Sequence, residues 1–141
     1  MKFDAFNVGD TFKTNTYHIT EEDIMQFATF YDPQYMHIDK EKAEQGQFGG
    51  IIASGFQTLS LSFKLWVETE IYGEDIIAGT RMDNVKFTKP VFPNDTIYVV
   101  VEVIDKKSTK KESGLLTIRM STYNHHDQLV FKGDLATIIA K

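Results

Sequence analysis

The chain has 141 residues, 42% of them hydrophobic and 25% charged, which fits one globular domain with a single core. Its formal charge of −5 argues against a nucleic-acid-binding protein, because a phosphate-binding surface needs a dense basic stripe. The lack of cysteine excludes disulfides, thiolate catalysis and cysteine-ligated zinc.

The first elements expected along the chain are a strand over residues 11–19 and a helix over residues 21–31. No apolar run of signal-peptide or membrane-span length is present, so we expect a cytoplasmic protein. Thr20 is a good N-cap for the helix, and Asp23 stands at the capping-box position. The helix is expected to end at the residue before Pro33, because proline disfavours a helical backbone there.

A polar loop with one or two short helical turns leads to a second, longer helix, predicted over residues 56–71. Phe56, Leu59, Phe63 and Trp66 recur at helical spacing, and further apolar residues widen this stripe. A helix with so wide an apolar face is expected to be largely buried.

The second half of the chain has runs in which apolar and polar residues alternate, a pattern typical of strands. These runs are 85–88, 96–103, 116–121 and 129–139. The order of elements favours an α+β fold in which one antiparallel sheet wraps around the long helix. A helix lying on an open α+β sheet fits the pattern nearly as well.

A small basic cluster follows the second of these runs and consists of Lys106, Lys107, Lys110 and Lys111. It lies among polar and acidic residues, which favours a solvated loop. A contact with the phosphates of a nucleotide-like substrate is the alternative.

Asp32 and His37 are the first candidates for chemistry, a carboxylate at a helix end and an imidazole five residues later. An anion at a helix C-terminus is unfavourable by roughly 0.3–1 kcal/mol, so an aspartate there invites an explanation. One explanation is that Asp-Pro makes a good turn. The other is that a site needs this carboxylate, with a raised pKa.

Gly49, Gly50 and Gly55 flank residues 51–54 directly before the long helix. Free backbone N–H groups at a helix start stabilise anions and polarised carbonyls, although for this segment taken alone a simple helix cap by Ser54 or Gly55 is the favoured explanation. Together with the Asp32/His37 pair, this segment suits water addition or proton transfer next to a conjugated thioester carbonyl.

These residues belong to a longer signature, Phe27-Ala28-x-x-Tyr31-Asp32-Pro33-Gln34-x-x-His37-x-Asp39, then Ala43, then Phe48-Gly49-Gly50-x-Ile52-Ala53-Ser54-Gly55. It resembles the signature of the MaoC-like dehydratase family, which includes the (R)-specific enoyl-CoA hydratases. Residues 88–91 and Asp95 also resemble a strand-end segment of that family. The resemblance implies a hot-dog fold over residues 1–141 and a homodimer or higher assembly. It also implies an interface active site with a tunnel for an acyl-pantetheine arm.

The implied activity is reversible hydration of a 2-enoyl thioester of coenzyme A or acyl carrier protein to an (R)-3-hydroxyacyl thioester, with no cofactor or metal. By resemblance, Asp32 and His37 are the acid/base pair, and the Gly55 N–H binds the thioester oxygen. The residues implied to line the adjacent pocket are Ser54, Ile52 and Phe48.

Three positions depart from the best-characterised hydratases, which carry Gly, Asn and Pro where this chain has Tyr31, Gln34 and Tyr35. We expect the two bulky tyrosines to reshape the pocket. A hot-dog thioesterase and a non-catalytic acyl-thioester-binding protein are rival functions. An iron site that uses His37 and Asp39 is a further alternative, and it needs a distant second histidine.

Overall fold

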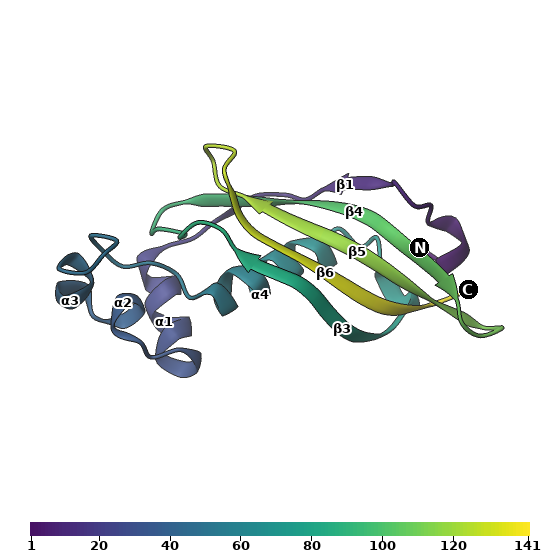
Figure 1. Ribbon diagram of the computed structural model, residues 1–141, viewed down its shortest axis with the longest axis horizontal. Coiled ribbons are helices and arrows are strands. Elements are labelled where there is room, and N and C mark those ends of the chain that lie inside the picture. Colours follow the sequence, from purple (N-terminus) through teal and green to yellow (C-terminus); the bar gives the residue numbers. More distant parts are fainter.

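The computed structural model describes residues 1–141 as one antiparallel sheet with a long helix against it and a group of short helices at one end (Figure 1). The helices are α1 (Glu21–Tyr31), α2 (Tyr35–Ile38), α3 (Lys40–Glu44) and α4 (Gly55–Val67). The strands are β1 (Thr11–Lys13), β2 (Tyr17–His18), β3 (Ile76–Phe87), β4 (Thr96–Ser108), β5 (Ser113–Tyr123) and β6 (Leu129–Ala140).

The sheet has the order β1-β4-β5-β6-β3, and β2 pairs with the start of β4. Its inner face carries alternate residues of the long strands, including Val101, Ile118 and Phe131, which are fully buried with Trp66 of α4. This is the predicted α+β hot-dog arrangement, a sheet wrapped around a helix.

The local signals around α1 act as predicted. The Thr20 side chain accepts from the Asp23 N–H and the Asp23 side chain accepts from the Thr20 N–H, so a full capping box begins the helix. The helix ends at Tyr31, with Asp32 as its C-cap before Pro33. The chain then makes the two short helices α2 and α3 that the polar loop suggested.

Helix α4 differs from its prediction in length and in burial. It ends at Val67 instead of residue 71, because the chain turns at Glu70, which has a positive φ of 62°. Its buried face includes Ser62, whose hydroxyl bonds that of Thr122 on β5 at 2.6 Å. The expectation of a largely buried helix is therefore wrong for one flank, where Phe56 is 64% exposed.

Strand β3 is much longer than its alternating pattern, which covers only the last few of its residues. Register shifts occur between Ile76 and Ala78, between Gly79 and Arg81 and between Asp83 and Lys86. Each such bulge shifts the following residues relative to the two faces of the sheet, so the sequence of β3 lacks the regular alternation of apolar and polar residues that predicts a strand. β3 is also the end of the sheet, and every one of its residues is exposed or half-exposed.

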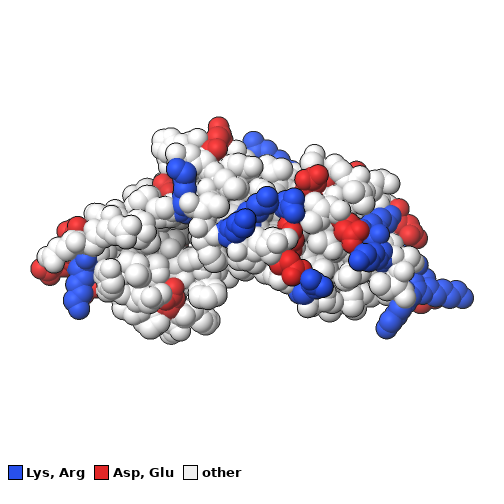
Figure 2. Space-filling view, viewed as in Figure 1, with Lys and Arg blue, Asp and Glu red and all other residues white.

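The predicted early strand is broken into β1 and β2 by residues 14–16. The basic cluster lies at the end of the sheet away from the short helices, around the β4–β5 hairpin (Figure 1). Lys106 is not a free loop residue, because its ammonium donates to the Phe6 carbonyl at 2.6 Å and lies over the Phe3 ring. On the face shown in Figure 2, basic and acidic side chains are interspersed. No helix combines the length and apolarity needed to cross a lipid bilayer.

Candidate active site

The helix end and the short helix after it bring Asp32 and His37 together. Asp32 Oδ2 lies 3.3 Å from His37 Nε2, and the two side chains are only 12% and 7% exposed. The turn between them is short because the Gln34 N–H donates to the Asp32 carbonyl at 2.8 Å. The predicted acid/base pair is thus a contact pair in a sheltered position.

The orientation of the His37 ring follows from its second nitrogen. Nδ1 lies 2.6 Å from the carbonyl oxygen of Ile52, and a carbonyl can only accept, so Nδ1 carries a hydrogen. Nε2 then faces Asp32 Oδ2 at 3.3 Å, and a hydrogen bond between them requires one hydrogen, on either atom. The geometry thus places the two atoms where they can share a proton.

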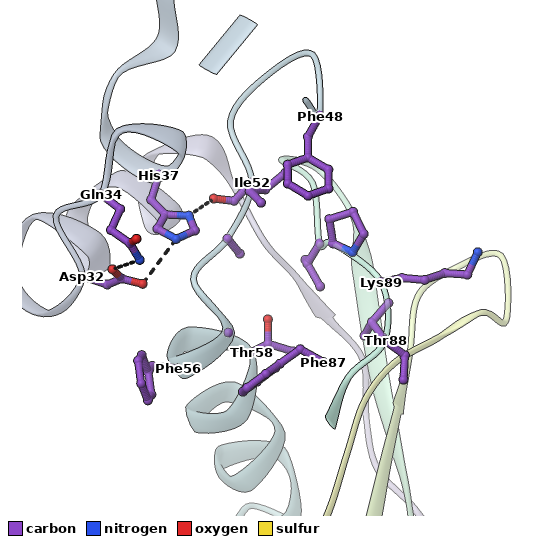
Figure 3. A pocket seen from close by; sticks show the side chains of 15 residues that line it. Asp32, Gln34, His37, Phe48, Ile52, Phe56, Thr58, Phe87, Thr88 and Lys89 are labelled. Atoms are coloured by element: carbon purple, nitrogen blue, oxygen red, sulfur yellow. Dashed lines mark hydrogen bonds and ion pairs between the residues drawn. The ribbon is translucent and has the colours of Figure 1, made fainter. Parts of the chain in front are cut away.

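The Asp32 carboxylate accepts hydrogen bonds from two side chains, of which Gln34 is drawn in Figure 3. The Ser54 hydroxyl donates to Oδ2 at 2.7 Å, and Nε2 of Gln34 donates to Oδ1 at 2.7 Å. Burial raises the pKa of Asp32, but the bonds from Ser54 and Gln34 and the neighbouring His37 outweigh it, so the pKa is lowered. The expectation of a raised pKa is wrong, because the donors stabilise the charged form.

Gly55, the first residue of α4, supplies the second part of the predicted site. Its N–H is among the donors that a helix start leaves free of intrahelical partners. The ring of Phe87 lies against it so closely that a Cβ at this position would come within 2.8 Å of Phe87 Cε1. Glycine therefore lets the aromatic ring and the backbone approach each other.

A cavity of about 440 Å³ joins these parts. Its lining includes Asp32, Gln34, His37, Phe48, Ile52, Ala53, Gly55, Phe56, Thr58, Phe87, Thr88, Lys89, Pro90, Val91 and Val130. The acid/base pair and the start of α4 lie on one side, and Lys89 points outward at the rim (Figure 3). The cavity thus combines the Asp32/His37 contact pair, a free helix start and an apolar wall.

Most of the residues predicted to line the pocket lie where the sequence placed them. Phe48, Ile52 and Gly55 line the cavity, whereas Ser54 is fully buried behind Asp32 and does not. The two tyrosines that were expected to reshape the pocket, Tyr31 and Tyr35, are not among its lining residues.

Several lining residues were not predicted as site residues. Phe87 and Val130 come from strands that are distant in sequence, and no local pattern marks them. Lys89 lies in the segment 88–91, and the resemblance of this segment to a strand end of the family was the only sign in the sequence that it borders the site. The sequence showed that Gln34 departs from the family signature, but it did not show that the Gln34 side chain bonds Asp32.

Main-chain bonds tie the parts of the site to one another. The Ile52 N–H donates to the Met36 carbonyl at 3.0 Å, while the Ile52 carbonyl accepts from His37. The Ala53 N–H donates to the Val91 carbonyl at 2.8 Å, which fixes the segment before α4 to the strand-end segment. The distance between the acid/base pair and the start of α4 is therefore set largely by backbone.

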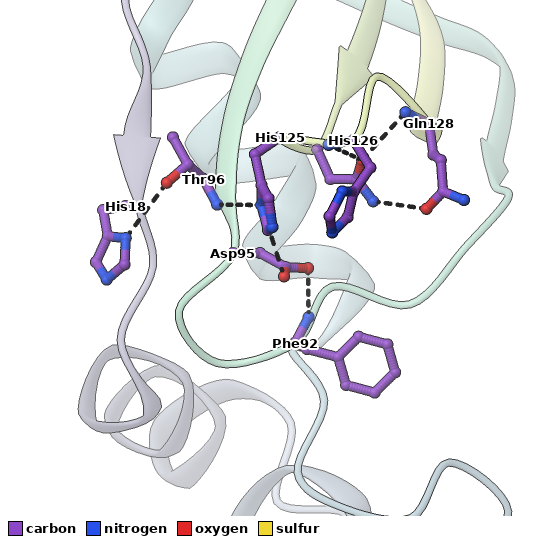
Figure 4. A network of polar contacts seen from close by, with 8 residues as sticks. His18, Phe92, Asp95, Thr96, His125, His126 and Gln128 are labelled. Atoms are coloured by element: carbon purple, nitrogen blue, oxygen red, sulfur yellow. Dashed lines mark hydrogen bonds and ion pairs between the residues drawn. The ribbon is translucent and has the colours of Figure 1, made fainter.

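The residues proposed for an iron site have other partners. The Asp39 carboxylate accepts from the Lys42 N–H as the N-cap of α3. His125 accepts from the Thr96 N–H at 3.2 Å and lies 3.9 Å from Asp95, in a network at the β5–β6 hairpin (Figure 4). The structure contains no group of three His, Asp or Glu side chains that could hold a metal ion, so the iron alternative has no second histidine near His37.

Comparison with known families supports the same interpretation, since residues 4–124 match the family described as MaoC like domain. The chain belongs to the MaoC-like family. It is 52% identical over 141 residues to the uncharacterized protein YdeM of Bacillus subtilis (strain 168), with full coverage of both chains. It is also 36% identical over 75 residues to 3-hydroxyacyl-thioester dehydratase Z of Mycobacterium tuberculosis, a match that spans 52% of this chain and 50% of that protein.

Two solved structures that share more than 25% sequence identity with this chain show the same fold. The monoamine oxidase regulatory protein of Archaeoglobus fulgidus has a TM-score of 0.92 at 29% identity, covering 100% of this chain and 95% of that chain. The R-hydratase PhaJ1 of Pseudomonas aeruginosa has a TM-score of 0.70 at 26% identity, covering 99% of this chain and 84% of that chain. The fold similarity to these two structures thus covers 99–100% of this chain.

Proposed function

We propose that this MaoC-like protein is a hydratase/dehydratase that adds water reversibly to a 2-enoyl thioester of coenzyme A or acyl carrier protein, giving an (R)-3-hydroxyacyl thioester. The observation that carries the proposal is the contact pair Asp32/His37 in the same cavity as the free helix start at Gly55. The similarity to an R-hydratase and to a 3-hydroxyacyl-thioester dehydratase supports it.

In the proposed reaction, the acid/base pair moves protons and the helix start binds the thioester oxygen. Water bound at Asp32 and His37 attacks the β-carbon and gives a proton to the pair as the new C–O bond forms. The electrons of the double bond move toward the thioester, whose oxygen gains negative charge beside the Gly55 N–H. The pair then returns a proton to the α-carbon, so that one water is added in total.

We propose that the working unit is a homodimer joined along β3. This strand is unpaired on its outer side, and three of its large apolar side chains, Ile77, Val85 and Phe87, are exposed. A long apolar edge strand is an aggregation hazard unless something covers it. A second, apolar hollow of about 420 Å³ lies between β3 and α4, and its lining includes Phe63 and Met82. A second copy on this flank would close the hollow into part of a tunnel for the acyl arm.

The first test is to mix the protein with crotonyl-CoA and follow the ultraviolet absorbance of the enoyl thioester together with release of free thiol. Loss of the absorbance without thiol release is the expected result. Release of thiol would instead indicate a thioesterase, in which the ionised Asp32 directs water at the carbonyl carbon. Neither signal, repeated over longer and branched acyl chains, would favour a protein that binds acyl thioesters without converting them.

A further inference from the structure

Of the three departures from the family signature, only Gln34 enters the site. Tyr31 is 73% exposed and Tyr35 is 48% exposed, and neither lines the cavity. Gln34 lines the cavity and donates its side-chain N–H to Oδ1 of Asp32.

The acceptor sites of Asp32 are nearly all in use. A carboxylate offers about four lone-pair directions, two on each oxygen. Oδ2 accepts from Ser54 and faces His37, and Oδ1 accepts from Gln34. The direction that remains for a water O–H is therefore on Oδ1, the oxygen that Gln34 holds.

Main-chain hydrogen bonds fix the backbone from which this exposed side chain extends. The Gln34 N–H donates to the Asp32 carbonyl at 2.8 Å, and the Gln34 carbonyl accepts from the His37 N–H at 3.0 Å. Gln34 is also the N-cap of α2, with extended φ and ψ of −83° and 148°. An asparagine at this position would have a side chain one methylene shorter, which would place its amide elsewhere relative to Oδ1.

We infer that Gln34 is a positioning residue, which holds the Asp32 carboxylate so that the free lone pair of Oδ1 is directed at the reacting water. The inference rests on the proposed function of this site. It gives a function to Gln34, the one departure from the family signature that enters the site. It also gives Ser54 and Gln34 different parts, since Ser54 bonds Oδ2 of Asp32 and Gln34 bonds Oδ1.

The test compares Gln34→Leu, which keeps the bulk and removes the donor, with Gln34→Glu, which replaces the donor by a like charge. Gln26→Leu is the matched control, because Gln26 is exposed on α1 and does not line the cavity. For Gln34→Leu we expect kcat for crotonyl-CoA to fall roughly ten- to hundredfold, the size of losing one hydrogen bond to a charged group, with KM changed less than about twofold.

The pH dependence separates positioning from a general loss of structure. Loss of the donor raises the pKa of Asp32, so the acidic limb of the kcat/KM profile moves to higher pH, and it moves further in Gln34→Glu. The carboxyl carbon of Asp32, followed by NMR through an acid titration, gives the same shift without turnover. A fall in kcat with an unmoved acidic limb and an unmoved carboxyl titration would mean a merely structural role and would overturn the inference.

The titration also keeps the two proposals apart. If the wild-type protein hydrates no enoyl thioester, the proposed function fails, and the carboxyl titration alone decides whether Gln34 controls Asp32. If the wild type is active but Gln34→Leu keeps both its kcat and its acidic limb, the inference about Gln34 is wrong while the proposed function stands.

Discussion

The two sides of helix α4 differ in how far contacts within this one chain cover their side chains or supply their hydrogen-bond partners. Around the start of the helix, Asp32 and His37 find polar partners within the chain, in Ser54, Gln34 and the Ile52 carbonyl. Along the neighbouring edge strand β3, apolar side chains such as Val85 and Phe87 remain exposed. The polar part of the candidate site is therefore held by one chain, whereas the proposed second copy would cover the apolar edge beside it.

The largest expected effect tests the polar region. Asp32→Asn keeps the shape of the side chain but replaces the charged carboxylate by a neutral amide. The carboxylate oxygens are the atoms that accept hydrogen bonds from Ser54 and Gln34. We expect kcat for an enoyl thioester to fall by about 10²–10⁴, the range for loss of a general acid or base, while the melting temperature shows a folded protein. Asp105→Asn is the control, because Asp105 pairs with Lys107 at a half-exposed site on β4, outside the cavity and not on β3. Near-wild-type turnover by Asp32→Asn would remove Asp32 from the proposed mechanism.

The second effect tests the apolar flank. Val85→Asp places a charge on the exposed edge of β3, where it would be buried unpaired if a second copy packs there. We expect light scattering to show a monomer and the activity to be largely lost, although Asp32 and His37 remain in place. Lys111→Asp, at the far hairpin, should remain a dimer. A wild-type protein that is already monomeric, or a Val85→Asp dimer with full activity, would break the comparison.

A third, smaller effect tests the contact between the start of α4 and the end of β3. Gly55→Ala introduces a Cβ that meets the Phe87 ring at 2.8 Å, so the ring and the helix start must separate. We expect kcat/KM to fall about 10- to 100-fold, a loss typical of a displaced oxyanion donor or a misplaced substrate. Adding Phe87→Leu should restore part of the loss, because the smaller side chain relieves the contact. If the double variant is no better than Gly55→Ala alone, the Phe87 contact is not what makes glycine necessary.

The smallest effect concerns the rim of the cavity. Lys89 is the only lysine or arginine that lines the cavity, and it forms no ion pair within the chain. Lys89→Gln should raise KM for crotonyl-CoA a few-fold, in a salt-dependent way, since exposed charge pairs contribute about 0–1 kcal/mol. KM for a crotonyl thioester of N-acetylcysteamine, which carries no phosphate, should stay unchanged. An equal change for both substrates would show that Lys89 shapes the pocket instead of attracting a phosphate.

The sequence predicted best what local contacts determine. The bounds of α1 follow from Thr20 and Pro33, which act within a few residues of themselves. The length of β3 could not be predicted, because its bulges arise from pairing with β6 and disturb the alternation. The burial of α4 was misjudged, since an apolar pattern does not say which apolar face meets the sheet.

The candidate site shows the same limit. Asp32, His37 and Gly55 were predicted as site residues from their spacing and their resemblance to the family, and the structure gathers them around one cavity. The role of Ser54 could not be read from the sequence, because its hydroxyl bonds a carboxylate that is 22 positions away. The lowered pKa of Asp32 follows from that bond and from Gln34, so the expectation of a raised value failed for the same reason.

The backbone link through Ile52 has a consequence for how this site can evolve. Its N–H and carbonyl join α2 to the segment before α4, and neither bond depends on the identity of the Ile52 side chain. Lining residues such as Phe48 and Val130 can therefore be exchanged without changing the separation of the Asp32/His37 pair and the start of α4. Under the proposed function, descendants of one ancestral sequence could diverge in acyl preference while inheriting the same placement of these two parts.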